Sequence, residues 1–197
     1  MSRATIAHLI LQVREMANVV PDAKTVNGVS YWTDDQIEAR LDRTRRNRVQ
    51  VEIEGVEDYI DGETVTTVYP YPYRWIEQTL VLRDTDGVIV NTGYTVNYDA
   101  QEIVFAANTD GDTYTITCKE YDLYSVAADI WDIKAGWLQA AVDWQTDNHN
   151  IKASQERDFC LKQAQRYREM AAELPMNAAT PRGVNIGFAE FERTDEL

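Results

Sequence analysis

The stretch YWTDDQIEARLDRTRRNRV, residues 31–49, marks the point where the hydrophobic pattern of the chain changes. Its first part predicts a helix, because Thr33 is a favourable N-cap and Gln36, three residues later, completes a capping box. Asp34 and Asp35 lie in the first turn and the arginines follow, which is the charge order that the helix dipole favours. Beyond this helix apolar and polar residues alternate, which predicts a half-buried strand. The chain therefore changes here from a helical part to a β part.

The same stretch gathers the positive charge of an acidic protein. Residues 1–48 hold eight Lys/Arg and six Asp/Glu, whereas residues 49–197 hold eleven and twenty-seven, and the formal net charge is −14. Such an acidic chain is not expected to clamp nucleic acid, because neutralising phosphates needs clustered cations. Five arginines fall within nine residues: Arg40, Arg43, Arg45, Arg46 and Arg48.

On a continuous helix Arg40, Arg43 and Arg46 form one ridge at three-residue spacing. Asp42 is within helical pairing distance of Arg45 and Arg46. Arg40 and Arg43 have no acidic residue three or four positions away. We therefore expect them to face solvent, a distant carboxylate or a partner.

The composition bounds the class of protein. With 197 residues, of which 44% are hydrophobic and 26% charged, the chain is typical of a soluble globular protein of one or two domains. It has no apolar run of the roughly 18 residues that a membrane helix needs. Its N-terminus lacks the layout of a signal peptide, so we expect assembly inside a cell. Two cysteines, Cys118 and Cys160, predict free thiols rather than a disulfide framework.

The periodicity predicts an α+β fold. Helices are expected over residues 4–19, from Thr33 to the arginines, over about 125–146 and over about 152–174. Between them the pattern predicts six or seven antiparallel strands in a small barrel or sandwich. We thus expect a four-helix domain (1–48 and 125–174), an inserted β module (49–124) and an extended C-terminal tail (175–197).

Several details of these elements are also predictable. Asp61-Gly62 indicates a turn, and Asn108–Gly111 is a strong hairpin signal. The prolines in ETVTTVYPYPY, residues 63–73, confine that strand to a sheet edge or an extended exit. Trp131 lies off the apolar face of its helix, and we expect it to face another subunit.

The tail combines two prolines and small residues with an alternating apolar pattern. Val184, Ile186 and Phe188 alternate, and Phe191 follows. A terminal strand without a hairpin partner often adds to the surface of another subunit, so these four residues are candidates for docking. The alternative is a disordered tail.

Residues for catalysis or metal binding are few. His8 lies inside the first helix and His149 in a polar turn, and neither accompanies a nucleophile in a known motif, so we expect both to be structural. Asp84–Gly87 and Asn108–Asp112 resemble fragments of calcium loops but lack the required glycine and glutamate. We expect no enzyme activity, no metal and no cofactor.

The order of elements resembles the head–tail connector, or adaptor, proteins of tailed bacteriophages. The resemblance is carried by the N-terminal helix, the loop, the capped helix in YWTDDQIEARL and the C-terminal helix pair with its tail. It covers roughly residues 1–48 and 125–197, whereas the β module is larger than the short hairpin of the simplest members of the family.

The resemblance implies a structural virion protein. Such proteins form a ring, usually of twelve subunits, in the neck beneath the portal, where they join head to tail and extend the DNA channel. It implies assembly in the cytoplasm of the bacterial host, with the portal, a downstream neck or tail protein and other copies of the chain as partners, and no membrane. Genomic DNA would pass through without sequence-specific binding.

In such a ring the arginines would contact the portal or the next subunit. The competing placement puts Arg40, Arg43 and Arg46 in the channel, against DNA phosphates. Two other functions stay open at this point. One is a tail-completion or baseplate component, and the other is a carbohydrate-binding module built on the Tyr- and Trp-rich β region.

Overall fold

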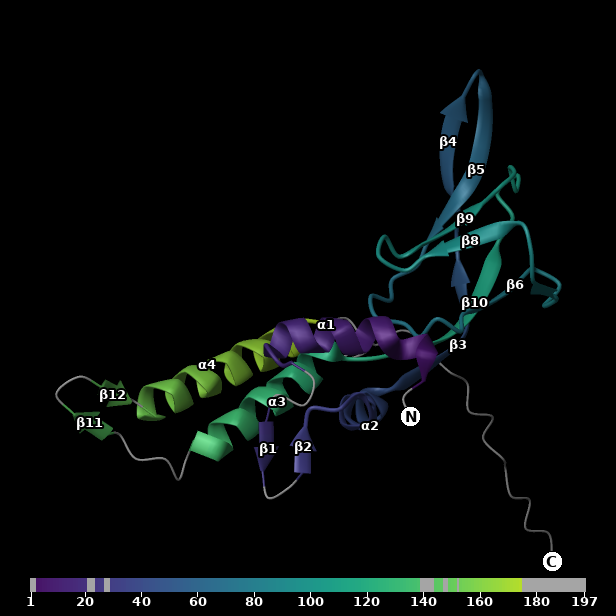
Figure 1. Cartoon of the computed structure of the whole chain (residues 1–197). Helices are drawn as coiled ribbons and strands as arrows, with labels where there is room; N and C mark the ends of the chain where they lie inside the picture. Colours follow the sequence, from purple (N-terminus) through teal and green to yellow (C-terminus); the bar gives the residue numbers. More distant parts are fainter. Residues whose placement is uncertain are drawn as a thin grey trace, which may run out of the picture.

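The computed structural model describes residues 3–20, 24–26, 29–138, 144–146, 149–151 and 153–174. Within these residues the chain is an α+β protein with four α-helices and two four-stranded antiparallel sheets. The helices lie together, and the two sheets stand beside them with one long hairpin projecting away (Figure 1). The α-helices are α1 (Ala7–Ala17), α2 (Asp34–Thr44), α3 (Leu123–Leu138) and α4 (Ala153–Ala172), and a 3-10 turn, η1 (Ala4–Ile6), precedes α1.

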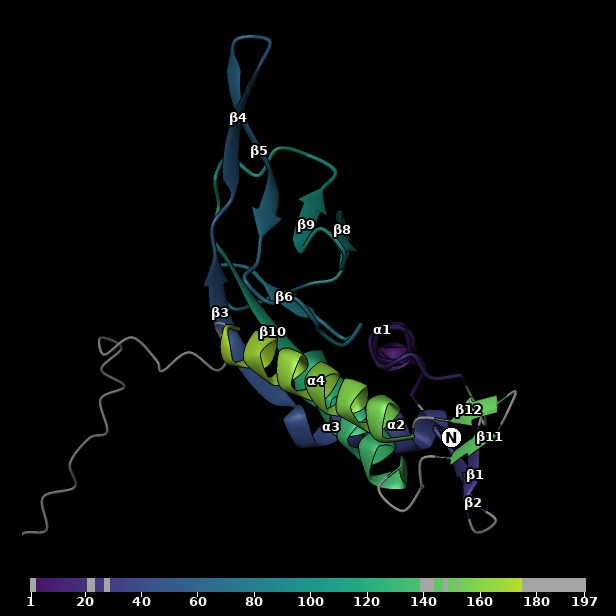
Figure 2. The same ribbon diagram turned by 90° about the vertical axis from the view of Figure 1, so that its left-hand side faces the viewer.

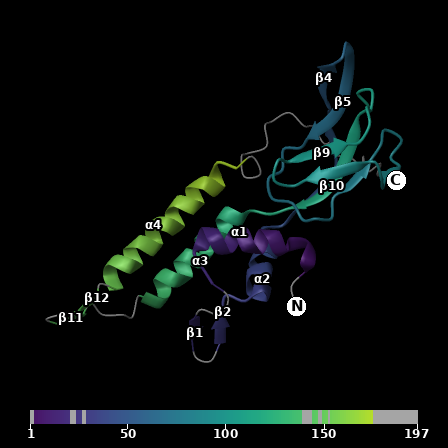
Figure 3. The same cartoon turned by 45° about the horizontal axis from the view of Figure 1, so that its top comes forward.

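The helical part is organised around α3. This helix contacts α1, α2 and α4, and Figure 3 shows α4 running alongside it. Apolar residues at three- and four-residue spacing on each helix face inward, as the sequence predicted. The core is formed by Ile6, Leu9, Ile10, Val13, Ala17, Trp32, Ile37, Leu41, Leu123, Val126 and Ile130, together with Trp75, Tyr121 and Tyr124.

The eight strands of the β module lie in sequence between α2 and α3. One sheet has the order β3-β10-β6-β7 and the other the order β4-β5-β9-β8. Both contribute to one core around Ile53, Tyr69, Leu82, Ile103 and Ile116. The strands are β3 (Arg46–Ile53), β4 (Val56–Ile60), β5 (Glu63–Pro70), β6 (Val81–Arg83), β7 (Ile89–Val90), β8 (Tyr94–Asn97), β9 (Glu102–Phe105) and β10 (Tyr114–Glu120).

The two sheets do not close into a barrel, so that form of the prediction is wrong. Each sheet keeps two edge strands, and Figure 2 shows β4 and β5 extending beyond the rest of the module. The edge position expected for residues 63–73 is confirmed in part: β5 lies between β4 and β9 in the sheet order, but residues 63–66 pair with β4 alone, and Tyr69 and Pro70 pair with β9 alone. Pro70 is tolerated at its end, since β4 pairs with β5 only as far as Val68 and leaves Pro70 paired with β9 alone.

The chain passes from one sheet to the other four times: from β3 to β4, from β5 to β6, from β7 to β8 and from β9 to β10. Between β3 and β4 it turns at Gly55, where an added Cβ would lie 2.2 Å from Cγ2 of Thr66 and 2.8 Å from Cζ of Tyr69. The last crossing is at Asn108–Gly111, between β9 and β10. The predicted hairpin there is wrong, because these two strands belong to different sheets. At the first crossing, the lack of a side chain at Gly55 lets the Thr66 and Tyr69 side chains lie closer to the backbone than any other residue would allow.

Two short hairpins are found where the sequence predicted a loop and the end of a helix. The segment before α2 forms β1 (Lys24–Val26) and β2 (Val29–Tyr31), where only a loop was expected. The third helix was expected to reach residue 146, but Trp144–Thr146 is strand β11 and pairs with β12 (His149–Ile151). Trp144 therefore fits the helical periodicity of the sequence although it lies in a strand.

Candidate interaction surface

The helix that carries the first arginines forms as its sequence predicts and then stops early. Oγ1 of Thr33 accepts a hydrogen bond from the Gln36 backbone N–H (3.3 Å), and the Gln36 side chain accepts one from the Thr33 N–H (3.1 Å). The helix ends at Thr44, and Arg45 is already extended, with φ −61° and ψ 131°.

The predicted ridge of Arg40, Arg43 and Arg46 is therefore wrong. Arg46 is the first residue of β3 and pairs in register with Glu120 of β10. The Thr44 hydroxyl donates to the Leu41 carbonyl and accepts from the Asp122 N–H, so it fixes the point where helix gives way to strand. Pairing with β10, far away in sequence, overrides the local preference for helix.

Two of the five arginines point inward. The guanidinium of Arg40 lies 5.2 Å from the ring centroid of the buried Trp32, and burial lowers the pKa of Arg40. The Arg48 side chain forms an ion pair of 2.8 Å with Glu120 and lies 5.0 Å from the Tyr73 ring centroid. Both side chains are committed to contacts within the chain.

The other three arginines form what we call the arginine surface: Arg43, Arg45 and Arg46, all exposed. Within the part of the chain that the structure describes, no ion pair is formed by Arg43. Arg45 lies 3.9 Å from Asp42, and both side chains are 40% exposed, so this pair is weak. The surface spans the junction of α2 and β3, and it offers a partner three exposed cations within four consecutive residues.

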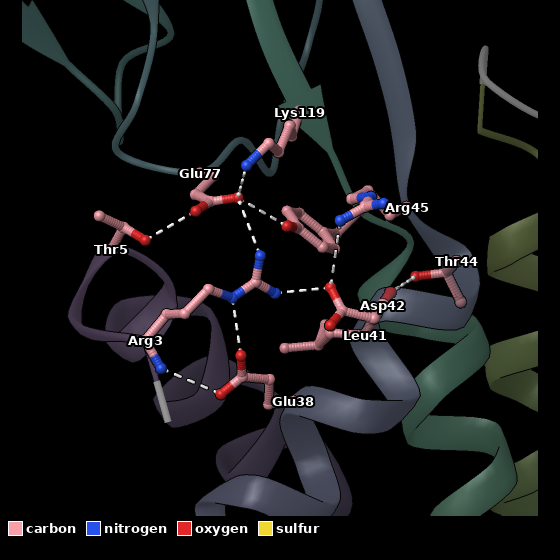
Figure 4. A network of polar contacts seen from close by, with 10 residues as sticks. Arg3, Thr5, Glu38, Leu41, Asp42, Thr44, Arg45, Glu77 and Lys119 are labelled. Atoms are coloured by element: carbon pink, nitrogen blue, oxygen red, sulfur yellow. Dashed lines mark hydrogen bonds and ion pairs between the residues drawn. The ribbon is translucent and has the colours of Figure 1, made fainter. Parts of the chain in front are cut away.

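A polar network behind this surface holds the helices to the β module (Figure 4). Arg3 donates from Nε to Glu38 (2.7 Å) and from Nη2 to Asp42 (2.5 Å), which ties the N-terminus to α2. Nη1 of Arg3 also lies 3.5 Å from Glu77, in the segment before β6. The arginine surface thus sits on a fixed junction rather than on a free loop.

Glu77 is the centre of that network, with its side chain only 2% exposed. It accepts hydrogen bonds from Thr5 (2.7 Å) and Tyr121 (2.8 Å), and Lys119 lies 3.2 Å away. Burial raises the pKa of Glu77, but the hydrogen bonds and the Lys119 charge outweigh it and hold the pKa below its ordinary value. Glu77 is therefore a buried carboxylate that stays ionised.

A second surface feature is the acidic hairpin, which we define as residues 56–65 of β4 and β5. It has four carboxylates and no Lys or Arg. Asp61 (φ 52°) and Gly62 (φ 93°) turn it, as the sequence predicted. The β9 strand pairs with β5 only from Val68 onward, so the hairpin extends as a two-stranded ribbon.

Apolar residues are exposed on this ribbon. Tyr59 is 72% exposed, Val56 53% and Ile60 49%. An isolated two-stranded hairpin is marginally stable in water, and large apolar side chains in the open are typical of a surface that a partner covers.

The other residues singled out in the sequence are Trp131, the two histidines and the tail candidates. Trp131 was expected to face another subunit, but it is buried, and its Nε1 donates to the Met16 carbonyl (3.2 Å). His8 is half-buried beside Tyr98, and burial lowers its pKa. The tail candidates Val184, Ile186, Phe188 and Phe191, and the side chain of His149, lie outside the described residues.

The described residues contain no group of three or more His, Cys, Asp or Glu side chains placed to hold a metal ion. Nor do they include a helix with the length and apolar character to span a membrane.

The arginine cluster could be predicted from the sequence, whereas the acidic hairpin was missed. The signal was present, because residues 49–73 contain six acidic residues and no Lys or Arg.

Comparison of the chain with protein-family models, with curated proteins and with solved structures finds no match. The residues and contacts described above are therefore the basis on which a function can be assigned.

Proposed function

We propose that this chain is a structural subunit of the neck of a tailed bacteriophage. In this proposal it forms a homo-oligomeric ring, of twelve subunits as is usual for connector proteins, beneath the portal, and it catalyses no reaction. The ring joins head to tail and continues the DNA channel, and the chain assembles in the cytoplasm of the bacterial host. The order of helices, β module and C-terminal helix pair supports this role by resemblance to connector proteins.

The observation that carries the proposal is the arginine surface. Three exposed arginines fall within residues 43–46, at the junction of α2 and β3, on a chain whose remaining residues are strongly acidic. The network around Arg3 and Glu77 holds the backbone of that junction in place. Exposed cations on such a fixed backbone favour association with a protein surface of complementary charge.

A protein contact fits this surface better than DNA does. The channel of a connector has to let DNA slide, and lysines or arginines on its wall would retain phosphates. We therefore assign the arginine surface to the portal or to the next subunit.

The test is assembly. Purified full-length protein, alone and mixed with the portal of the same virus, is examined by electron microscopy and mass photometry. We expect rings, or a portal carrying one additional symmetric layer. A protein that stays monomeric and ignores the portal would contradict the proposal and favour a tail component.

The arginine surface is tested in the same experiment with Arg43→Glu. We expect this variant to lose the ring or the added layer. The control is Arg166→Glu, which reverses an exposed arginine on α4 and has the same effect on net charge. Equal assembly by the two variants would remove the arginine surface from the proposal.

A further inference from the structure

We propose that the acidic hairpin of one copy docks on the arginine surface of the next copy. This inference rests on the proposed ring, and it names the partner of the arginine surface. The two surfaces are complementary in charge: four carboxylates without a cation in residues 56–65, against Arg43, Arg45 and Arg46. Opposite potentials of this kind orient an encounter and set its register.

One molecule does not satisfy this contact by itself. The hairpin projects from the far end of the β module, whereas α2 and the start of β3 lie at its near end (Figure 2). The partner must therefore be a second copy. Contact between two different surfaces of the same chain is heterologous, so it passes from copy to copy and closes into a ring where the rotation allows.

The receiving side also offers apolar surface for the hairpin. Val49, on the edge strand β3, is 66% exposed, and the alternation along the extended chain places it on the same side as Arg45. A surface pocket of about 380 Å³ lies there, lined in part by Val49, Val81 and Lys119. It provides a site for the ring of Tyr59, which is 72% exposed on the hairpin. An aromatic anchor within a charged rim is a common design of protein interfaces.

The C-terminal tail is a weaker candidate for the same site. Its acidic residues Glu190, Glu192, Asp195 and Glu196 are interspersed with Arg182 and Arg193. The hairpin carries carboxylates alone, so its attraction to three arginines is not offset by cations of its own.

Disulfide trapping between two full-length variants tests the contact. Protein with Tyr59→Cys, carrying a tag that changes its mass, is mixed with protein carrying Val49→Cys and oxidised. The control mixture replaces Val49→Cys by Val88→Cys, since Val88 is 60% exposed on the same module. Cys118 lines the pocket beside Val49 and is replaced by alanine in every sample, so that Tyr59→Cys can pair only with the introduced cysteine, and the native Cys160 is buried. We expect mixed dimers in the first mixture, in yield about tenfold above the control.

Charge reversal then tests the electrostatic part. Arg43→Glu with Arg45→Glu in the Val49→Cys protein should reduce the mixed dimer by about tenfold or more. Adding Glu57→Arg and Asp58→Arg to the Tyr59→Cys protein should restore it. Restoration by a second reversal excludes the explanation that the first pair of substitutions only damages folding.

The outcomes separate this inference from the proposed function. Equal yields with Val49→Cys and Val88→Cys overturn the inference, even if the protein still forms rings on the portal. A trapped hairpin contact in a protein that ignores the portal supports the inference and removes the connector role. If the full-length proteins give no excess of mixed dimer and removal of residues 175–197 raises its yield, the tail is the occupant and the inference is wrong.

Discussion

The hydroxyl of Tyr121 donates a hydrogen bond of 2.8 Å to the carboxylate of Glu77, at the place where β10 leads into α3. Tyr121 is fully buried, and its backbone N–H donates to the Trp75 carbonyl (2.9 Å). This pair of residues lies at the boundary between the helical core and the β module. Because hydrogen bonds to buried charged groups contribute more than neutral ones, the pair should be important for joining the two parts.

Replacing Tyr121 by Phe should therefore destabilise the protein. The substitution removes one donor from a buried carboxylate, which typically costs about 1–3 kcal/mol in the free energy of unfolding. Urea unfolding followed by circular dichroism measures it. Tyr94→Phe is the matched control, because no hydrogen bond of the Tyr94 hydroxyl is found among the described residues. Equal stability of the two variants would contradict the role given to Tyr121.

The free energy of unfolding should fall in acid, because Glu77 becomes protonated. Its pKa is held below its ordinary value of 4.5, so its contribution is fully present above that value and is lost as the pH falls through the lowered pKa. Glu120 acts oppositely, because burial, against the opposing effect of Arg48, raises its pKa. We expect the Glu77→Gln protein to be less stable than the wild type at pH 7. We also expect it to lose less stability than the wild type when the pH is lowered.

The measurement is urea unfolding at several values between about pH 7 and pH 3. Glu63→Gln, an exposed residue of the acidic hairpin, serves as control and should follow the wild-type profile. A Glu77→Gln protein whose stability falls as steeply as that of the wild type would show that another group is responsible for the acid sensitivity.

Arg40 and Arg43, one helical turn apart, should respond differently to substitution. Arg40→Ala removes a partly buried side chain that stacks on Trp32, which should cost about 1 kcal/mol. Arg43→Ala removes an exposed side chain and should change stability by less than about 0.5 kcal/mol. Thermal unfolding of both variants checks the difference. The opposite order would contradict the placement of the two arginines.

Replacing Gly55 or Gly136 by alanine should change the free energy of unfolding in opposite directions. At Gly55 the added Cβ meets Thr66 and Tyr69, and such overpacking costs about 1–3 kcal/mol. At Gly136, within α3, nothing lies within 4 Å of an added Cβ, and the higher helix propensity of alanine should stabilise by about 0.5–1 kcal/mol. Urea unfolding of both variants checks this, and a stable Gly55→Ala protein would contradict the described crossing.

The features that could be predicted from the sequence are mostly local. The capping box of Thr33 and Gln36 and the turn at Asp61-Gly62 each depend on a few adjacent residues, and both are present. The α+β class also follows from local periodicity. In contrast, the end of α2 at Thr44 and the sheet crossing at Asn108–Gly111 depend on pairing with distant strands, which periodicity does not reveal.

The same limit applies to the candidate surface. The sequence showed five clustered arginines, but which of them are exposed depends on partners elsewhere in the chain. Arg48 turns inward because its guanidinium reaches the carboxylate of Glu120, two residues along β10 from its register partner Cys118. Arg40 turns towards Trp32, eight positions earlier and outside the helix. Only the folded arrangement separates these two from the three exposed arginines.

The arginine surface and the acidic hairpin lie on one continuous run of backbone, which passes from the end of α2 through β3, Gly55 and β4. In a ring closed by contacts between them, each subunit would be held at the two ends of this run. A force that pulls neighbouring subunits apart would then be carried by the covalent backbone of each subunit rather than by the packing of its helical core.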